Sequence, residues 1–370
     1  MTSLLKGHAT AQGTAHYSRR FEEIGGNGHF RIAEDLTWSS LGLGTYLGRA
    51  DAPTDRQVTA SWVQSVRAGI NVVDTAINYR SEHAEQSVGK ALKEIVAQKV
   101  ADRNELIVCT KGGFLPQSLG QAWFQETFVQ GAKTGVREND LVAECHCMHP
   151  AYLEDQLDRS RKNLGVETID LYYLHNPEMQ VGEVDGGVFY NRLESAFSFL
   201  ERAAKEGKIR YYGLATWSAF RVGRGGRGMS LVRTCEAARR AAGGAESRLR
   251  FIQLPLNLQM LQAVRTPTQE VEGKMWPAIP AAGKLGLHCL TSGSIAQGDI
   301  PIQGPDLVRR FGPNLSTDAQ RALQFTRSAP GVLTALVGMK QASHVRENLD
   351  LVRQPALSAE TFEDLITKIK

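Results

Sequence analysis

Short apolar runs alternate along this chain with longer segments in which apolar side chains recur every three or four residues. Runs of the first kind are typical of strands, and segments of the second kind are typical of helices with one buried face. The runs predict strands at 39–45, 71–75, 106–111, 169–174, 209–214, 250–254, 286–290 and 332–337. The segments between them predict helices at 54–68, 81–98, 150–164, 188–206, 229–242, 272–283 and 316–328, and an eighth at 342–353.

The predicted helix at 188–206 shows how one strand–helix unit passes to the next. It carries a single apolar stripe, formed by Leu193, Ala196, Leu200 and Ala203. Gly207 can supply a left-handed stop, and Ile209 begins the next apolar run. The pattern therefore predicts a helix that packs one face on a sheet and then returns the chain to that sheet.

The predicted strands lack the polar alternation of a sheet with one wet face, which indicates a parallel sheet covered on both sides. Eight strand–helix units in one chain favour a closed (β/α)8 TIM barrel. An open doubly wound sheet is the competing architecture, but no GxGxxG motif opens a helix after the first strand. We therefore predict an α/β protein with a single barrel domain over residues 28–370.

Some segments fall outside a minimal barrel. The polar, Gly-rich residues 1–27 are expected to form a flexible N-terminal lead-in, either loose or laid across the barrel floor. Residues 29–32 and 38–45 predict an N-terminal β-hairpin that runs into the first barrel strand. Long βα loops on the catalytic face would wall a substrate pocket, and they are predicted at 112–149, 176–187 and 218–228.

Composition narrows the class of protein. With 370 residues and 42% apolar content, the chain can bury a core of barrel size. The formal net charge is only +4 and the charges are scattered, so we expect a small-molecule partner, with no nucleic acid and no membrane. The five cysteines are an odd number in a long chain, which favours a reducing cytoplasm. No signal sequence or apolar span of ~20 residues is visible, so we expect a soluble protein.

Four ionisable residues follow the predicted strands, at the edge where a parallel barrel collects its functional groups. Asp74 closes the second strand, Tyr79 comes five residues later, and Lys111 and His175 close the next two strands. A tyrosine with an ordinary pKa near ~10 needs a neighbouring cation to act as a proton donor or base at neutral pH. Lys111 can be that cation and Asp74 can keep it protonated. His175 can hydrogen-bond the reacting oxygen. We predict that these four residues form a catalytic proton-transfer site.

These residues lie in segments that resemble the aldo-keto reductase superfamily, over about residues 38–355. The matching segments are NVVDTAINYR with the following Glu85, the strand ending in Thr110-Lys111, DLYYLHNPE, GKIRYYGLATW, FIQLPLN and VGMKQASHVRENL. The resemblance implies a barrel that reduces aldehyde or ketone carbonyls with NADPH, with NADH also possible. It places Asp74, Tyr79, Lys111 and His175 at the catalytic positions, with Tyr79 as the general acid.

The resemblance also implies where the cofactor is held. In the family a Ser-Asn pair and a Gln hold the nicotinamide carboxamide; here the pair is Ala215-Thr216 and the Gln is Gln253. The loop after the seventh strand reads as a pyrophosphate strap or an ordinary turn, with candidate residues Thr291, Ser292, Gly293 and Gly298. The last strand-to-helix junction would hold the adenosine and its 2′-phosphate, through Gly338, Lys340, His344, Glu347 and Asn348. His344 stands where the family often has arginine, so both cofactors stay candidates.

Other interpretations remain open at this stage. A nucleotide-binding regulatory or sensory barrel with little turnover is the alternative to an enzyme. The run CHCMH at 145–149 resembles metal ligands, but adjacent ligands point apart and a zinc site needs separated pairs, so we predict no metal. Arg221, Arg224 and Arg227 lie in a Gly-rich loop that either clamps an anion or is solvated. The carbonyl substrate, the favoured direction and the oligomeric state do not follow from the sequence.

Overall fold

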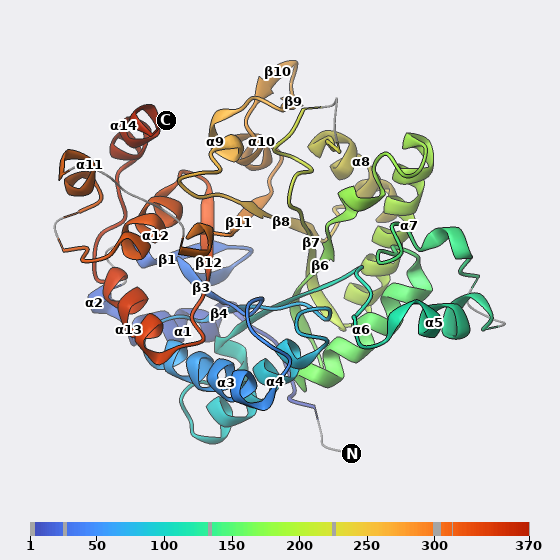
Figure 1. The fold of residues 1–370 in the computed structure, drawn as a ribbon, viewed down its shortest axis with the longest axis horizontal. Coiled ribbons are helices and arrows are strands. Elements are labelled where there is room, and N and C mark those ends of the chain that lie inside the picture. Colours follow the sequence, from blue (N-terminus) through green and yellow to red (C-terminus); the bar gives the residue numbers. More distant parts are fainter. Residues whose placement is uncertain are drawn as a thin grey trace.

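Eight parallel strands close into a barrel that is ringed by helices (Figure 1). The structure is a computed structural model and describes residues 4–24, 28–131, 135–223, 227–298, 305–312 and 314–369. The barrel strands are β3 (Leu41–Gly44), β4 (Val72–Asp74), β5 (Ile107–Gly112), β6 (Ile169–His175), β7 (Ile209–Ala215), β8 (Leu249–Pro255), β11 (His288–Ser292) and β12 (Val332–Gly338). They follow one another in chain order around the ring, and β12 closes it against β3. The predicted (β/α)8 TIM barrel is confirmed.

In the described part of the chain, a helix follows each barrel strand and packs on its outer face. These helices are α3 (Ala52–Arg67), α4 (His83–Ala97), α6 (Pro150–Leu164), α7 (Gly186–Lys205), α8 (Leu231–Ala241), α10 (Ala278–Lys284), α12 (Asp318–Ser328) and α13 (Ala342–Leu351). Helix α3 buries one apolar stripe, with Val58 at 3%, Trp62 at 0% and Val66 at 1% exposure. The main apolar core therefore lies between the sheet and the ring of helices.

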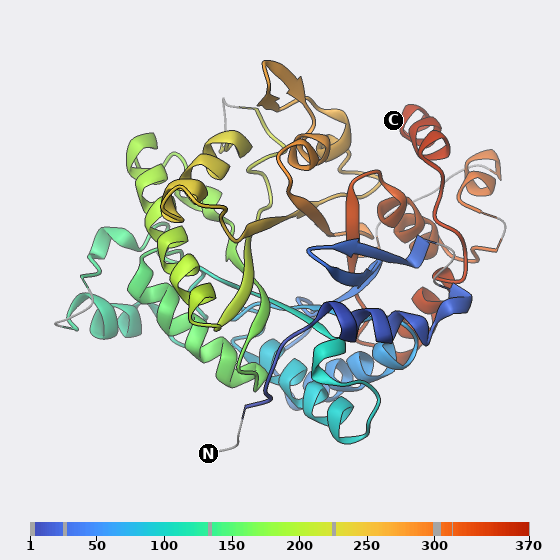
Figure 2. The same ribbon diagram turned by 180° about the vertical axis from the view of Figure 1, so that it is seen from behind.

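The predicted hairpin is also present and closes the floor of the barrel (Figure 2). It consists of β1 (Phe30–Ala33) and β2 (Leu36–Ser39), which pair antiparallel. Trp38 is 1% exposed and packs on Phe251 of β8, with ring centroids 5.2 Å apart. The other members of this second apolar cluster come from the hairpin, from Ala9 and from several barrel strands. The hairpin therefore acts as a hydrophobic plug beneath the sheet.

The N-terminal lead-in is packed against this floor where the structure describes it, rather than flexible. Helix α1 (Ala11–Arg19) buries Tyr17, whose hydroxyl donates to the carbonyl of Val66 at 2.6 Å. Ahead of α1, the N–H of Ala9 donates to Asp170 Oδ1 at 2.7 Å. The other oxygen of Asp170 pairs with Arg103 at 2.8 Å. These buried polar contacts favour the second expectation, a segment laid across the floor; residues 1–3 and 25–27 lie outside the described residues.

One predicted element is wrong in its first half. A hairpin of β9 (Gln269–Val271) and β10 (Lys274–Trp276) overlaps the predicted helix 272–283. The first part of that range is therefore a turn and a strand, and only its later part enters α10. Glu272 and Gly273 have φ of +53° and +72°, so they form a tight turn that a helix cannot contain. The other seven helices and all eight barrel strands match their predicted ranges within two residues at each end.

Shorter elements fill the connections. They are α2 (Glu22–Ile24), α5 (Gly120–Phe124), α9 (Gln262–Arg265), α11 (Pro305–Arg310) and α14 (Ala359–Lys368), with single helical turns at Arg103–Glu105, Gln125–Val129, Glu138–Asp140, Pro177–Gln180 and Ala296–Gly298. Within the described residues, every helix is too short or too polar to cross a lipid bilayer.

Candidate active site

The four predicted catalytic residues lie together at the carboxyl ends of neighbouring strands. Asp74 is the last residue of β4, His175 is the last residue of β6, and Lys111 is near the end of β5. Because these three strands are parallel neighbours, their ends meet at one edge of the barrel. Tyr79 comes from the loop between β4 and α4. The barrel thus gathers on one side residues that are far apart in the chain.

Lys111 and Asp74 form a buried ion pair. Lys111 is 0% exposed and Asp74 is 4% exposed. The Lys111 ammonium contacts Asp74 Oδ1 and donates to the carbonyl of Thr75 at 2.8 Å. Burial alone would lower the pKa of Lys111, but the charge of Asp74, its hydrogen bond and the interactions with Tyr79 together outweigh burial and raise it. Lys111 is therefore a cation throughout the neutral range.

Tyr79 lies against that cation. The Lys111 Nζ is 4.8 Å from the centre of the Tyr79 ring. Burial raises the pKa of Tyr79 above that of ordinary tyrosine, while the charge of Lys111 acts in the opposite direction. The phenol consequently holds its proton at neutral pH, and the ammonium is in place to stabilise the phenolate once the proton has left.

His175 stands on the other side of the phenol. The two rings are 5.6 Å apart and nearly perpendicular. Burial lowers the pKa of His175 well below its ordinary value, and the nearby charge of Lys111 lowers it further. His175 is thus a neutral imidazole, which can donate a hydrogen bond but brings no charge to the site.

His146 lies behind His175 and contacts its backbone. His146 Nε2 is 2.7 Å from the carbonyl oxygen of His175, and since a carbonyl only accepts, this nitrogen carries the hydrogen. Burial lowers the pKa of His146 to about 4, so it is neutral as well. The CHCMH run at 145–149 therefore supports the backbone of His175. No group of three metal-binding side chains occurs among the residues that the structure describes.

Aromatic rings form the rim of the site. Tyr46 lies 5.0 Å from Tyr79 and is 62% exposed, and Phe114 lies 4.9 Å from His175. Trp217, after β7, is 48% exposed. Tyr46 and Phe114 thus place apolar ring surface beside Tyr79 and His175.

Gln253 ties the predicted nicotinamide contacts to the catalytic residues. Its amide donates to Asp74 Oδ2 at 2.9 Å from β8, which lies across the ring from β4. Gln253 also anchors the neighbouring candidate through its backbone, because Thr216 N donates to the Gln253 carbonyl at 2.8 Å. Thr216 and Gln253 are each 4% exposed. Gln253 therefore contacts the Asp74–Lys111 pair directly, and Thr216 is joined to it through the backbone of Gln253.

The predicted strap after β11 has features that suit a phosphate. Gly293 and Gly298 have φ of +62° and +92°, and Asn257 donates to the Gly293 carbonyl at 2.8 Å. The buried hydroxyls of Thr291 and Ser294 have no hydrogen-bond partner among the described residues. Ser292 ends the strand and is half-buried. Unused donors beside a left-handed turn fit an anionic ligand.

The candidates at the junction between β12 and α13 divide into two groups. Gly338 and His344 are exposed, while Lys340 is half-buried with its ammonium next to Gly48. Glu347 and Asn348 lie further along α13: the Glu347 carboxylate accepts from the Thr317 hydroxyl, and Asn348 is 4% exposed. Lys340 and His344 are thus accessible to an anion at the start of a helix, whereas Glu347 is already occupied by a contact within the protein.

A model of the Aldo/keto reductase family matches residues 40–224, half of the chain. The chain is an aldo/keto reductase family member. It is 28% identical over 190 residues to the NADH-specific methylglyoxal reductase of Escherichia coli K12, covering 50% of both chains. It is 26% identical over 216 residues to a putative voltage-gated potassium channel subunit beta of Schizosaccharomyces pombe, covering 57% of this chain and 50% of that protein. This aldo/keto reductase thus spans about half the length of the curated relatives it matches.

Solved structures of the family share the fold over nearly the whole chain. An aldo/keto reductase from Klebsiella pneumoniae, in complex with NADP and acetate, superposes with a TM-score of 0.61 at 21% identity, covering 92% of this chain and 94% of that one. The holo form of an aldo-keto reductase from Bacillus halodurans gives 0.62 at 22% identity, covering 92% and 96%. At such identities the likeness concerns the barrel alone.

The arginines of the loop after β7 hold the reductase's own loops. Arg221 donates to the Trp217 carbonyl and to Gln262, both at 2.8 Å, and Arg227 pairs with Glu183 at 3.1 Å. Arg224 lies outside the described residues. Neither of the two described arginines is left free to clamp an anion.

The long loop between β5 and α6 has a small apolar core of its own, which we call the loop core. Its buried members are Leu115, Phe124, Phe128, Val136, Cys147 and Tyr152. Phe128 packs on Tyr152 with ring centroids 5.3 Å apart. Phe124 and Phe128 therefore serve mainly to fold this loop.

Three residues of the site were not predicted as such. Glu178 anchors the loop after β7, Tyr46 packs on Tyr79, and Arg80 braces the turn that follows Tyr79. Glu178 lies only three residues after His175, and Arg80 directly follows Tyr79. Their proximity in sequence to catalytic positions was the available signal.

Proposed function

We propose that this protein is an NAD(P)H-dependent oxidoreductase that reduces aldehyde or ketone carbonyls to alcohols. The observation that carries the proposal is the buried Lys111–Asp74 pair lying against the Tyr79 phenol. Such a pair has a chemical use, because it stabilises the phenolate that remains after a proton is given away. Membership of the aldo/keto reductase family supports the same chemistry.

Each residue has one task in this reaction. Tyr79 donates its proton to the carbonyl oxygen as that oxygen gains negative charge. Lys111 stabilises the resulting phenolate, and Asp74 holds the ammonium in position and keeps it charged. His175, a neutral imidazole, donates a hydrogen bond to the same oxygen and so orients the substrate. The bound nicotinamide supplies the hydride, so no metal or covalent intermediate is required.

We propose NADPH as the cofactor, with NADH also accepted. Gln253 and Thr216 would hold the nicotinamide end, and the strap from Thr291 to Gly298 would hold the pyrophosphate. Lys340 and His344 would meet the 2′-phosphate. The unpartnered hydroxyls of the strap and the accessible side chains of Lys340 and His344 at the start of α13 support this placement. Among similar proteins, one structure contains NADP and one relative is named as NADH-specific, which supports both cofactors.

We infer a small carbonyl compound as the substrate and the cytoplasm as the compartment. The exposed rings of Tyr46 and Trp217 support a substrate with some apolar surface. All five cysteines are unpaired, which supports a reducing environment. An enzyme is favoured over a regulatory barrel because all four catalytic residue types are present and in contact.

The test is consumption of NADPH, and separately of NADH, with a panel of simple aldehydes, aldoses and ketones. Tyr79→Phe should lower carbonyl reduction by about 10²–10⁴-fold while NADPH still binds, because the ring stays and only the proton donor is lost. Tyr211→Phe, on the barrel floor, is the matched control and should keep full activity. Near wild-type turnover of Tyr79→Phe would falsify the assignment. A wild-type protein that binds NADPH without turnover would instead identify the regulatory alternative.

A further inference from the structure

The backbone directly after Tyr79 is held in an unfavourable conformation. Arg80, Ser81 and Glu82 have φ of +50°, +52° and +74°, and none of them is glycine. Left-handed conformations of such residues persist only where the surroundings impose them, and they concentrate at functional sites. Three in a row, joined to the proposed proton donor, call for a restraint that acts on this turn.

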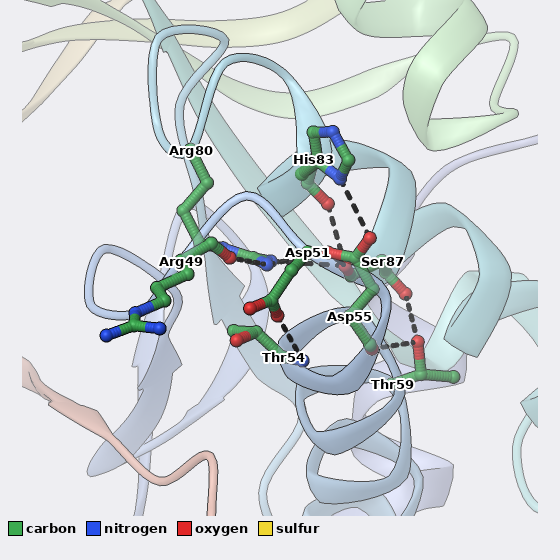
Figure 3. A network of polar contacts seen from close by, with 8 residues as sticks. All are labelled: Arg49, Asp51, Thr54, Asp55, Thr59, Arg80, His83 and Ser87. Carbon is green, nitrogen blue, oxygen red and sulfur yellow. Dashed lines mark hydrogen bonds and ion pairs between the residues drawn. The ribbon is translucent and has the colours of Figure 1, made fainter.

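The side chain of Arg80 supplies such a restraint (Figure 3). One guanidinium nitrogen donates to Asp55 Oδ1 at 2.6 Å and to the Arg49 carbonyl at 3.3 Å. The other donates to Ser87 Oγ at 3.1 Å. The Arg80 side chain is 2% exposed. One buried cation therefore links α3, the loop before α3 and the first turns of α4 to the residue that follows Tyr79.

Asp55 is held as the partner of this cation from several sides. Its second oxygen contacts His83 Nδ1 at 2.8 Å, and its first accepts from Ser87 Oγ at 3.1 Å. Burial would raise the pKa of Asp55, but the hydrogen bonds from His83, Arg80 and Ser87 outweigh burial and lower it. Asp55 is thus a carboxylate wherever the protein is folded near neutral pH.

The far end of the turn is tied to a different helix. The Glu82 carboxylate contacts Arg159 and accepts from Asn163 Nδ2 at 2.8 Å, both on α6. The loop at the Arg49 end carries Tyr46, which packs on the Tyr79 ring. The left-handed turn is therefore fixed at both ends, and the Arg80 end also orders the ring that covers the phenol.

We propose that the Arg80–Asp55 ion pair is a positioning clamp for Tyr79. It holds the left-handed turn so that the phenol points at Lys111 and His175, and it takes no part in proton transfer. The inference rests on the proposed function only for its effect on turnover. Its effect on the placement of the Tyr79 phenol can be measured without any reaction.

Arg80→Gly is the central variant. Glycine accepts the left-handed backbone without strain, so this change removes the clamp and spares the turn itself. A displacement of about 1 Å in a reacting group can cost ~10²-fold in rate, so we expect kcat to fall by about 10- to 100-fold while NADPH affinity is unchanged. Lys99→Gly is the matched control, because Lys99 also has a positive φ, of +53°, but is exposed and lies beyond the C-terminal end of α4. It should keep wild-type kcat.

Two further variants test the pairing. Asp55→Asn removes the charge while keeping the shape, and it should reproduce the loss of kcat in weaker form. The double variant Arg80→Gly/Asp55→Asn should be no slower than Arg80→Gly alone, because residues that act through one contact are not additive. Arg80→Lys retains the charge and should recover part of the activity. If Arg80→Gly fails to fold, Asp55→Asn decides the question in its place.

A readout independent of turnover is the ultraviolet titration of the Tyr79 phenol, obtained as the difference between each protein and its Tyr79→Phe counterpart. Lys111, Asp74, His175 and Tyr46 face this phenol and stay unchanged in every variant. Release of the turn should move the titration down towards that of ordinary tyrosine, since burial holds it up in the native protein. Unchanged kcat and an unchanged titration in Arg80→Gly would overturn the clamp. An inactive wild-type protein would refute the proposed function, and the titration would still decide the clamp.

Discussion

One carboxylate oxygen of Glu178 accepts the backbone N–H of Trp217 at 2.6 Å and that of Ser218 at 2.9 Å. Glu178 is 3% exposed, and burial raises its pKa although these N–H groups act in the opposite direction. The contact joins the loop after β6, next to His175, to the loop after β7. The buried Glu178 carboxylate therefore fixes the backbone that carries the Trp217 indole.

Glu178→Ala should release Trp217 and leave the backbone N–H groups of Trp217 and Ser218 without their acceptor. We expect a stability loss of about 1–3 kcal/mol, the usual value for hydrogen bonds to a charged group, and a higher KM for carbonyl substrates with little change in kcat. Urea unfolding measures the loss of stability, steady-state kinetics measure KM and kcat, and tryptophan emission reports the release of Trp217. Glu183→Ala, an exposed acid of the neighbouring loop, is the control. Identical emission and unfolding curves for both variants would show that Glu178 does not anchor the loop.

Lys111→Met keeps the length of the side chain but removes its charge. Lys111 acts to lower the pKa of Tyr79, so its loss should raise that pKa further and slow carbonyl reduction by about 10²–10⁴-fold. The variant also leaves Asp74 buried without its cation, so the pKa of Asp74 should rise. Turnover measured across pH tests the prediction. An unchanged rate with an unchanged pH profile would mean that Lys111 only supports the fold.

His344→Arg should strengthen the choice of NADPH over NADH. An arginine carries a permanent charge and binds phosphate in a bidentate manner, whereas histidine is charged only over part of the accessible pH range. We expect NADPH to bind more tightly by about 1–3 kcal/mol, with NADH affinity unchanged as the internal control. Cofactor fluorescence titrations at about pH 6 and pH 8 measure both affinities. If the natural protein binds NADH as tightly as NADPH at both pH values, the proposed 2′-phosphate site is wrong.

Glu85 predicts a specific dependence of stability on pH. It is fully buried and accepts hydrogen bonds from Thr110 at 2.7 Å and Asn163 at 2.9 Å, and burial raises its pKa from 4.5 to about 7. The folded state therefore binds this proton more tightly than the unfolded state. The resulting stability is present below pH 4.5 and is lost as pH rises through about 7.

Glu85→Gln should remove that dependence, because an amide makes similar hydrogen bonds and does not titrate. At about 1.4 kcal/mol per pKa unit, the change in unfolding free energy between pH 5 and pH 8 should differ between the two proteins by on the order of 3 kcal/mol. Urea unfolding at both pH values gives the numbers. Equal pH dependence in the two proteins would show that Glu85 is not the titrating group.

Hydrophobic periodicity was sufficient to predict the barrel, because each strand and helix buries its own face. This periodicity failed to predict elements whose structure depends on contacts with residues far away in the sequence. Helix α1 is polar, and it docks because Gly13 lets its backbone approach Asn104, where an added Cβ would come within 2.3 Å of a carbonyl oxygen. The sequence around Gly13 does not indicate that Asn104 packs against this glycine. We predicted a helix where the chain forms the hairpin at 269–276, because a Glu-Gly turn is a weak signal in a segment whose composition otherwise favours a helix.

The convergence of the four candidate catalytic residues was predictable for the same reason as the barrel, since the strand ends can be located in the sequence and the ends of parallel strands meet at one edge. Arg80 and Glu178 were not, because each acts through a partner that the chain order separates from it. Arg80 needs Asp55 on the preceding helix, and Glu178 needs the backbone of Trp217 beyond the next strand. Partners of this kind become visible only when the fold brings the two segments together.

The loop core bears on how this protein can change. Its buried side chains pack on one another and include Tyr152, which lies on α6. A sequence that keeps this miniature interior and its attachment could therefore be exchanged as one block, with altered length or shape, while the strand ends beneath it keep their chemistry. Selection, or a protein engineer, can thus rebuild this outer part of the loop while His146 keeps its contact with the backbone of His175.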